Sequence, residues 1–481
     1  MNRAPAGNEL DSISKQLNAC LGQQKSACHA NPNPDYLQRK ADLLALKRLV
    51  NDNQEALIAA INEDYGNRAR NETRLAEILE VLDGINFALK HLKRWMKPQR
   101  RHIDVLLYPG AKNRSIPQPL GVVGVIVPWN FPLQLALSPL TYIFAAGNRA
   151  MVKMSENSSH LARLLQRLVV LYFPPEKLSF FAETGQVGVQ FSQLPFDHLL
   201  FTGSGATGRA VMAAAARNLT PVTLELGGKS PAVIAADFPL HQAVERILFA
   251  KLFNAGQICI TVDYVFVPED RIGAFVDAAR SYVQSNCPDI HSQDYTAIID
   301  PRAYERLRDS LADAQDKGAK LVNLAGQQQA NQTTRKLPPY LVLNTSADMD
   351  LMQHEIFGPI LPVLPYRDRQ EVVDYVSRRN LPLAFYLFTN DRDLQNYYLD
   401  HIMSGGVCVN DALLHFAQHD MPFGGIGASG MGQYHAYEGF MTFSKLRPVF
   451  YQARCSVLKL LAPLHGTWAT RLLGIILKLK N

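Results

Sequence analysis

The spacing of hydrophobic positions changes near Gly121. In residues 36–50 and 75–92, apolar side chains recur at steps of three, four and seven, which is typical of amphipathic helices. From Gly121 onward, short β-branched runs alternate with segments of helix length. This pattern predicts an opening helical region followed by a parallel sheet with crossover helices. Residues 1–33 are mostly polar and end in Asn-Pro repeats, so we expect a loose lead-in there.

Two further segments interrupt this alternation. Residues 104–120 carry four prolines or glycines among alternating apolar positions, which predicts a protruding hairpin. The tail from Val457 to Lys480 is apolar but broken by charges, and it is expected to form a pair of weakly amphipathic helices rather than a membrane span. Subunit packing or a solvated tail is the favoured interpretation, and contact with a membrane surface is the alternative.

Composition places the chain among ordinary globular enzymes. The 481 residues are 47% hydrophobic and 19% charged with a net charge of +6, which excludes disordered and fibrous proteins and suggests about three structural units. Basic residues do not form an aromatic-interleaved stripe, so no nucleic-acid partner is expected. The six cysteines form no CxxC pair, which argues against disulfides and against a metal site. With no apolar leader visible, a cytoplasmic location is expected.

A glycine-rich turn is the first candidate for chemistry. In FTGSGATGR, Gly203, Gly205 and Gly208 match GxGxxG between an apolar run and a predicted helix. Such a turn lets backbone N–H groups at a helix N-terminus approach a pyrophosphate. The alternative is a turn without a ligand. An acid about 20 residues further on would hold the adenosine ribose, and both Glu225 and Glu156 follow predicted strands.

The second candidate is Cys259 in FNAGQIC. Most free cysteines are small buried hydrophobic residues. Here the cysteine follows Asn and Gly in a turn-like stretch, where substrate could reach a thiolate stabilised by backbone donors. From the residues alone both interpretations stay open.

Seven motifs together resemble the aldehyde dehydrogenase superfamily over residues 37–443. They are PWNFP (128–132), VKMSE (152–156), FTGSGATG (201–208), ELGGK (225–229), FNAGQIC (253–259), EIFGP (355–359) and PFGGIGASGMG (422–432). The segment SGMGQYHAYEGFMTFSK is similar to the class 3 branch, in particular to the bacterial coniferyl aldehyde dehydrogenases. VKMSE lacks the proline that commonly follows the lysine in this family.

The resemblance implies three catalytic residues. Cys259 would attack the aldehyde carbonyl, the Asn130 amide would hold the resulting oxyanion with the Cys259 N–H, and Glu225 would activate the water that hydrolyses the thioester. Partial burial would raise the pKa of Glu225 toward neutrality. With this role, Glu225 is no longer expected to bind the adenosine ribose.

The cofactor implied by the resemblance is NAD, with NADP as the alternative. Lys153 and Glu156 would hold the adenosine ribose, and Gly203, Ser204 and Gly208 would form the pyrophosphate turn. On the nicotinamide side, the residues expected to contribute are Trp129, Glu355 and Phe357.

The implied fold is α/β, with a Rossmann-type parallel-sheet cofactor domain, a second α/β catalytic domain and a small bridging element. Residues 1–103 and 121–226 would bind NAD(P), 227–409 would form the catalytic domain, 104–120 and 410–450 would bridge two subunits of a homodimer, and 451–481 would be the tail. The expected substrate is coniferyl or another aromatic aldehyde. Medium or long aliphatic aldehydes are the second choice, acyl transfer to coenzyme A is a third possibility, and a catalytically silent homologue is the non-enzymatic alternative.

Overall fold

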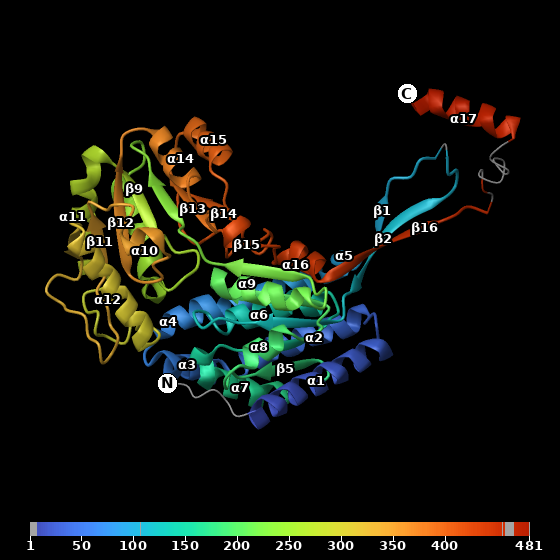
Figure 1. Cartoon of the computed structure of the whole chain (residues 1–481), viewed down its shortest axis with the longest axis horizontal. Helices are drawn as coiled ribbons and strands as arrows, with labels where there is room; N and C mark the ends of the chain where they lie inside the picture. Colours follow the sequence, from blue (N-terminus) through green and yellow to red (C-terminus); the bar gives the residue numbers. More distant parts are fainter. Residues whose placement is uncertain (1–6, 106, 455, 457–465, 481) are drawn as a thin grey trace.

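The computed structural model describes residues 7–105, 107–454, 456 and 466–480. These residues form two α/β bodies and one projecting arm, each built on its own sheet (Figure 1). The predicted α/β architecture with two parallel-sheet domains is confirmed.

The first body contains a six-stranded sheet in the order β15-β7-β6-β3-β4-β5. Its strands are β3 (Val122–Ile126), β4 (Arg149–Lys153), β5 (Leu178–Phe181), β6 (His198–Gly203), β7 (Val222–Leu226) and β15 (Gly430–Met431). All pairings are parallel except that of β15 with β7. The strands follow the β-branched runs of the sequence, and every residue of β3 is buried because helices cover both faces of a parallel sheet.

Helices of this body precede the sheet or connect its strands. They are α1 (Gly7–Ala30), α2 (Tyr36–Asn51), α3 (Gln54–Tyr65), α4 (Arg70–Thr73), the π-helical turn η1 (Arg74–Leu79), α5 (Glu80–Trp95), α6 (Gln134–Ala145), η2 (Glu156–Ser158), α7 (Ser159–Val169), α8 (Val187–Ser192), α9 (Gly205–Ala216), η5 (Gly427–Ser429) and α16 (Ala436–Thr442). The helices expected over residues 36–50 and 75–92 are confirmed.

The expectation of a loose lead-in over residues 1–33 is wrong, because α1 occupies most of it. Leu17 and Leu21 are buried one helical turn apart and pack with the sheet and α8. Gln24, also buried, donates a hydrogen bond to the backbone carbonyl of Ala150 on β4 at 2.9 Å. A narrow apolar stripe within a polar segment is sufficient here because the sheet face supplies the rest of the contact.

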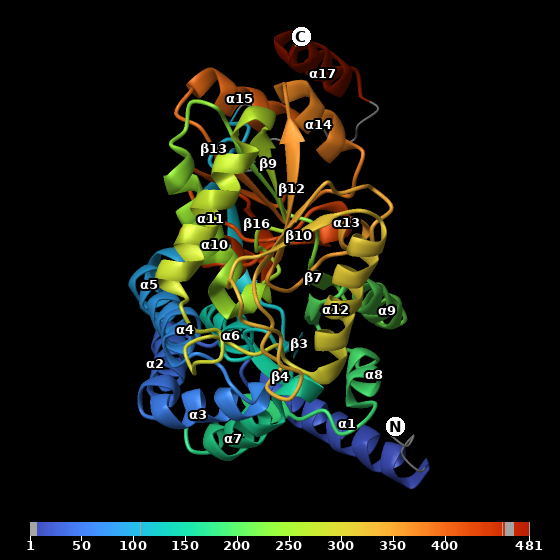
Figure 2. The ribbon, with the colours of Figure 1, turned by 90° about the vertical axis from the view of Figure 1, so that its left-hand side faces the viewer.

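The second body contains a seven-stranded sheet in the order β10-β11-β12-β9-β8-β13-β14. Its strands are β8 (Pro231–Ile234), β9 (Tyr264–Pro268), β10 (Lys320–Asn323), β11 (Tyr340–Leu343), β12 (Ile360–Tyr366), β13 (Ala384–Phe388) and β14 (Gly406–Val409). Its helices are α10 (Leu240–Leu252), η3 (Phe253–Gly256), η4 (Glu269–Arg271), α11 (Ile272–Asn286), α12 (Pro301–Asp316), α13 (Asp350–Gln353), α14 (Arg369–Ser377) and α15 (Arg392–His401). Figure 2 shows α10 and α11 on one side of these strands and α12 on the other.

The arm is a three-stranded antiparallel sheet of β1 (Gln99–Arg101), β2 (Lys112–Pro119) and β16 (Ser444–Tyr451). It projects from the body, which confirms the protruding hairpin, and α17 (Thr467–Lys480) lies at its far end (Figure 1). Of the predicted helix pair in the tail, only α17 falls among the described residues. No helix of the described residues is long and apolar enough to cross a membrane. The domain boundaries stay a prediction.

Candidate active site

A strained turn presents Cys259 between α10 and β9. Asn254 and Ala255 adopt left-handed backbone angles, with φ of 51° and 49°. Gly256 also has a positive φ, and a Cβ there would lie 2.3 Å from the carbonyl oxygen of Gly358. Only glycine fits at this position, so the FNAG sequence sets the path of the chain into Cys259.

Glu225 lies on β7 in the first body, where its backbone pairs with Thr202 on one side and Gly430 on the other. Its side chain is buried, and neither carboxylate oxygen has a hydrogen-bond partner among the described residues. Desolvation raises the pKa of Glu225 well above its ordinary value. A carboxylate in this environment has a strong tendency to accept a proton.

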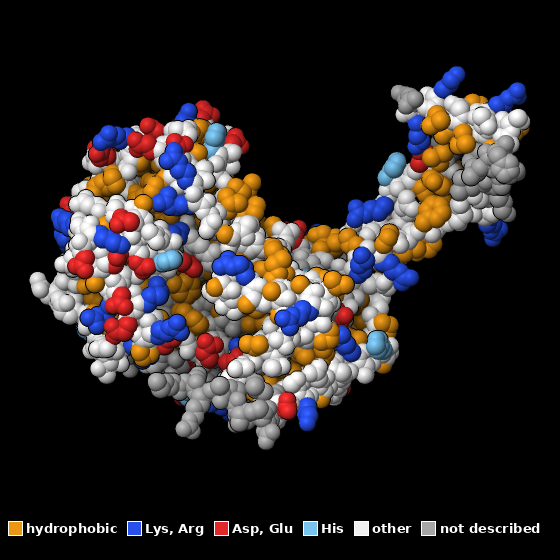
Figure 3. Space-filling view, viewed as in Figure 1, with side chains coloured by type: hydrophobic (Ala, Val, Ile, Leu, Met, Phe, Trp, Pro, Cys, Tyr) orange, Lys and Arg blue, Asp and Glu red, His pale blue; other side chains and the backbone are white. Residues whose placement is uncertain are grey.

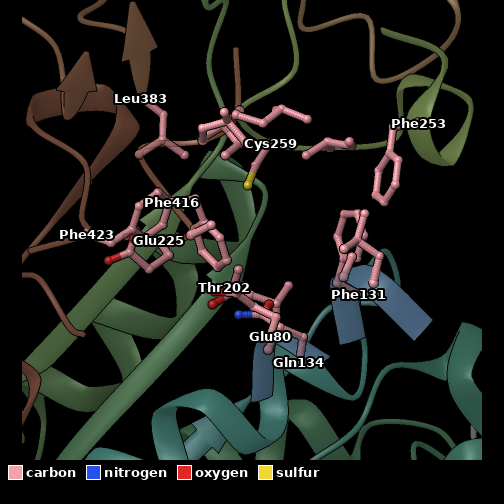
Figure 4. Close-up of a pocket in the computed structure, with 18 of the residues that line it drawn as sticks. Glu80, Phe131, Gln134, Thr202, Glu225, Phe253, Cys259, Leu383, Phe416 and Phe423 are labelled. Carbon is pink, nitrogen blue, oxygen red and sulfur yellow. The ribbon is translucent and has the colours of Figure 1, made fainter. Parts of the chain in front are cut away.

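Two cavities meet at these residues. The first, here called the apolar pocket, has a volume of about 340 Å³ and is lined by six aromatic residues, Phe131, Phe249, Phe253, Phe416, Phe423 and Tyr434, with aliphatic side chains between them. Figure 4 shows the sulfur of Cys259 turned into this pocket. The second cavity, about 210 Å³, contains Trp129, Asn130, Gly203, Ser204, Glu355 and Phe357. Cys259 and Glu225 line both cavities, so a group bound in either one can reach them.

The surroundings of Cys259 oppose ionisation of its thiol. The pKa of Cys259 is raised to about 12, first by desolvation and then by the nearby carboxylates of Glu355 and Glu225, against the opposing effect of the Cys259 and Ile260 N–H groups. The sequence indicated the backbone donors but not the two carboxylates. The sulfur therefore rests as a thiol and requires a base.

Asn130 is anchored through its backbone and its side chain. Its carbonyl oxygen accepts hydrogen bonds from Tyr65 Oη and Arg68 at 2.9 Å each and from Asn254 Nδ2 at 3.1 Å. Its own Nδ2 donates to the carbonyl oxygen of Gln257 at 3.3 Å. These bonds tie the PWNFP loop to the turn that carries the cysteine.

A buried ionic cluster supports this junction, and sequence reasoning missed it. The fully buried Arg68 lies 3.8 Å from both Glu72 and Glu77, and its guanidinium stacks over the ring of Phe131. Glu77 accepts hydrogen bonds from the N–H groups of Leu133 and Gln134, and Glu72 accepts one from the N–H of Asn254.

Lys153 ends β4 and Glu156 begins η2, and neither residue lines the apolar pocket or the second cavity. Glu156 is exposed, whereas Lys153 is buried and forms an ion pair with Glu183 at 2.7 Å. Glu183 also accepts hydrogen bonds from three N–H groups at the start of α8, and the lysine is the largest cause that lowers its pKa against desolvation. Glu183 was another residue that sequence reasoning did not identify.

The glycine-rich turn connects β6 with α9. Ser204 caps α9 by accepting a hydrogen bond from the Thr207 N–H. A Cβ at Gly208 would lie 2.7 Å from Leu226, so this glycine serves close packing of the helix on the strand. A third cavity of about 640 Å³ begins at Ser204 and includes Arg209 and Lys229.

Glu355, Phe357 and Trp129 gather on the other side of the second cavity. Burial raises the pKa of Glu355 to about 8, with Asp263 adding to the effect. The rings of Trp129 and Phe357 pack edge to face, with centroids 5.4 Å apart. Lys229, from the ELGGK motif, is bonded to Asp263 and to the carbonyl oxygen of Leu351.

The second and third cavities suit a dinucleotide. They share Ser204, Gly227 and Glu355, so an elongated ligand can run from Cys259 to the N-terminus of α9. A Cβ at Gly227 would collide with the Glu355 carboxylate, which explains why this position requires a glycine. Helix N-H groups and the Arg209 and Lys229 side chains favour phosphate.

Comparison with known proteins gives the family of this chain. Residues 10–449 match the aldehyde dehydrogenase family. A probable coniferyl aldehyde dehydrogenase of Pseudomonas aeruginosa is 50% identical, with 94% of each chain covered. The substrate-bound state of Staphylococcus aureus AldH has a TM-score of 0.90 at 32% identity, covering 95% of this chain and 99% of that one.

A Mycobacterium tuberculosis aldehyde dehydrogenase complexed with NAD⁺ shares the fold, with a TM-score of 0.81 at 24% identity and coverage of 92% and 90%. The resemblance seen in the seven motifs is thus confirmed along nearly the whole chain. Together with the thiol and the buried carboxylate at the junction of two cavities, these matches show that the chain belongs to the aldehyde dehydrogenase family, whose members oxidise aldehydes with NAD(P).

Proposed function

We propose that this enzyme oxidises an aromatic aldehyde of the coniferyl type to its carboxylic acid, with Cys259 as nucleophile and Glu225 as base. The observation that carries the proposal is that both residues line the apolar pocket and the second cavity where the two meet. A substrate carbonyl in one cavity and a hydride acceptor in the other then converge on the same sulfur.

The first step is proton removal from Cys259. Its raised pKa requires a base, and Glu225 is a buried carboxylate whose own raised pKa favours accepting that proton. The sulfur forms a bond to the carbonyl carbon, and the oxygen becomes an oxyanion. The Asn130 Nδ2 group has two hydrogens, one of which is bonded to Gln257. The other hydrogen and the Cys259 N–H would stabilise the oxyanion.

NAD(P), held in the second and third cavities, would supply the hydride acceptor that oxidises the thiohemiacetal to a thioester. After Glu225 has released its first proton to solvent, it takes a second one from water. That water attacks the thioester, the carbon–sulfur bond breaks and the acid leaves. Water is favoured over coenzyme A as the acceptor because the unpaired Glu225 carboxylate lies within the pocket.

The cofactor residues are assigned from their positions. Ser204 and the Gly203 and Gly208 turn would hold the pyrophosphate, and Glu355, Phe357 and Trp129 would hold the nicotinamide end. Lys153 and the exposed Glu156 would bind the adenosine ribose. NAD is preferred over NADP because Glu156 and Glu183 add negative charge close to the place of a 2′-phosphate.

An aromatic substrate is supported by the lining of the apolar pocket. Its six aromatic side chains offer flat faces for a ring. The Pseudomonas aeruginosa relative, which is 50% identical to this chain, is a probable coniferyl aldehyde dehydrogenase. Aliphatic aldehydes would fill the same apolar volume without using those faces.

A panel of aromatic and aliphatic aldehydes, compared as kcat/KM with NAD and with NADP, tests this proposal. We expect cinnamaldehyde-type substrates and NAD to rank first, and Cys259→Ala to lose turnover while it still binds NAD. Acid formation must occur without coenzyme A. A higher kcat/KM for hexanal or longer alkanals would overturn the substrate class, and residual turnover near wild type in Cys259→Ala would overturn the nucleophile.

The assembly and location complete the proposal. The projecting arm would pair with a second copy in a homodimer, since β16 forms one edge of the arm sheet and carries the exposed Phe450 and Tyr451. Figure 3 shows hydrophobic side chains along this arm. We assign the enzyme to the cytoplasm and favour subunit packing over membrane contact for α17. The two catalytic and cofactor domains would follow the boundaries expected from the sequence.

A further inference from the structure

The apolar pocket contains a polar corner that the proposed chemistry does not use. Glu80, on α5, and Gln134, on α6, both line the pocket. Figure 4 shows them in the lower half of the view, whereas Cys259 lies in the upper half. They are thus separate from the residues that act on the carbonyl.

Both side chains have unused hydrogen-bonding capacity. Gln134 is 2% exposed, and its Nε2 has no partner among the described residues. The same holds for the buried Glu80 Oε1. Buried polar atoms are almost always bonded, so an exception within a ligand pocket points to the ligand.

The neighbouring side chains do not satisfy this carboxyl group. His419 Nε2 lies 3.7 Å from Glu80 Oε1, too far for a hydrogen bond. Burial lowers the pKa of His419, so the ring stays neutral and gives no ion pair. Asp83 is the other charged residue lining this side of the pocket, and its charge adds to the raised pKa of Glu80.

We propose that Glu80 and Gln134 form a subsite for the ring hydroxyl of a phenolic aldehyde, at the end of the substrate remote from the carbonyl. This inference rests on the proposed function and narrows its substrate class. A hydroxyl group is both donor and acceptor, so its O–H can donate to Glu80 Oε1 while its oxygen accepts from Gln134 Nε2. An alkyl chain or an unsubstituted ring would leave both groups unpaired.

Three substrates that share the cinnamaldehyde framework and differ only at the 4-position distinguish the parts of this subsite. They are 4-hydroxycinnamaldehyde, 4-methoxycinnamaldehyde, which can only accept, and cinnamaldehyde, which can do neither. For the wild type we expect kcat/KM to fall in that order, by about tenfold or more between first and last, as polar sites discriminate against analogues that lack a hydroxyl. Equal values for the first and last substrates would overturn the subsite.

Variants then assign the effect to the residues. Glu80→Leu should reduce the ratio of kcat/KM for the hydroxylated over the unsubstituted substrate about tenfold, chiefly by raising KM for the former, while cinnamaldehyde turnover is kept or improved. Glu80→Gln, which retains an acceptor, should preserve most of the ratio. Lys90→Met changes the charge of an exposed residue on the same helix that does not line the pocket, and it should leave the ratio unchanged.

Cinnamaldehyde turnover is the control for folding and for the proposed function. If Glu80→Leu does not fold, Gln134→Leu serves instead, and it should abolish the preference for the methoxy substrate over cinnamaldehyde. An equal loss on all three substrates would mean a structural role and overturn the inference. If the wild type oxidises none of these aldehydes, the proposed function fails; if it oxidises them without preference, only this inference fails.

Discussion

At the scale of single residues, the expectation from the sequence and the structure differ most over the ionisation of Cys259. The motif predicted a reactive thiolate, but the fold places two carboxylates and little solvent around the sulfur, which raises its pKa to about 12. Nucleophilic reactivity in the ligand-free enzyme must therefore increase with pH across the neutral range.

Alkylation of Cys259 by iodoacetamide measures this directly. In cofactor-free enzyme, the rate should rise about tenfold per pH unit between about pH 7 and pH 9, because the thiolate fraction does so below the pKa. Subtracting the rate of Cys259→Ala removes the other thiols. A plateau below about pH 8 would contradict the raised pKa.

The Glu355→Gln variant tests the raised pKa of Cys259 in a second way. The Glu355 carboxyl has a pKa of about 8, so its charge opposes the thiolate only above that value. The variant should therefore be alkylated faster than wild type above about pH 8 and at a similar rate below about pH 7. A slower rate at high pH would mean that Glu355 does not act on Cys259 through its charge.

Glu225→Gln should separate the two halves of the reaction. The amide cannot accept a proton, so thioester hydrolysis should slow by about 100-fold or more, in the range typical of a lost general base. Stopped-flow absorbance would measure the initial burst of reduced cofactor, and steady-state rates would measure deacylation. With Glu225 as base for the thiol as well, the burst should persist but become faster with pH; a burst unchanged in rate would restrict Glu225 to hydrolysis.

At the scale of elements, the buried ionic cluster joins three separate segments at the active site. Arg68 and its acidic partners connect the start of α4 and the turn η1 with the PWNFP loop and the FNAG turn. Arg68→Met should lower the free energy of unfolding by about 3–5 kcal/mol, because Glu72 and Glu77 lose their buried partner. Because Asn130 also loses a hydrogen bond, kcat should fall.

Denaturant unfolding and kcat should be measured on the same preparation. Arg70→Met is the matched control, since Arg70 pairs with Glu55 at an exposed position, where such pairs contribute less than about 1 kcal/mol. Similar losses of stability in the two variants would contradict a special role for the buried cluster.

The comparison of sequence with structure also differs between elements. Strands β3, β4, β6 and β7 could be predicted because they are short, mostly apolar runs that are buried along most of their length. Helix α1 could not be predicted, because its apolar stripe is short and most of the apolar surface that stabilises it belongs to the sheet that it covers. Motifs also identified most residues around the two cavities, although Lys153, Glu156 and Gly208 line neither. Arg68 and Glu183 could not be identified in this way, because they act through partners that are distant in sequence or carry no motif.

At the scale of the whole molecule, the arm is expected to hold the dimer together. Val449→Asp places a charge on β16, where the neighbouring Phe450 is already exposed in the single chain. We expect this variant to shift from dimer to monomer in sedimentation equilibrium, because an unpaired charge at an apolar interface is costly. Val170→Asp, at an exposed position in the body, should remain dimeric. A wild-type protein that sediments as a monomer would refute the arrangement.

The pairing of β15 with β7 has a consequence for the order of events in the cell. The strand that carries Glu225 acquires its outer neighbour, Gly430, only from the far end of the polypeptide. A nascent chain on the ribosome can complete the nucleotide-side helices and most of the sheet long before that residue emerges. The catalytic centre is thus finished after nearly all of the protein has been translated, and fragments lacking the last strands should be inert toward aldehydes.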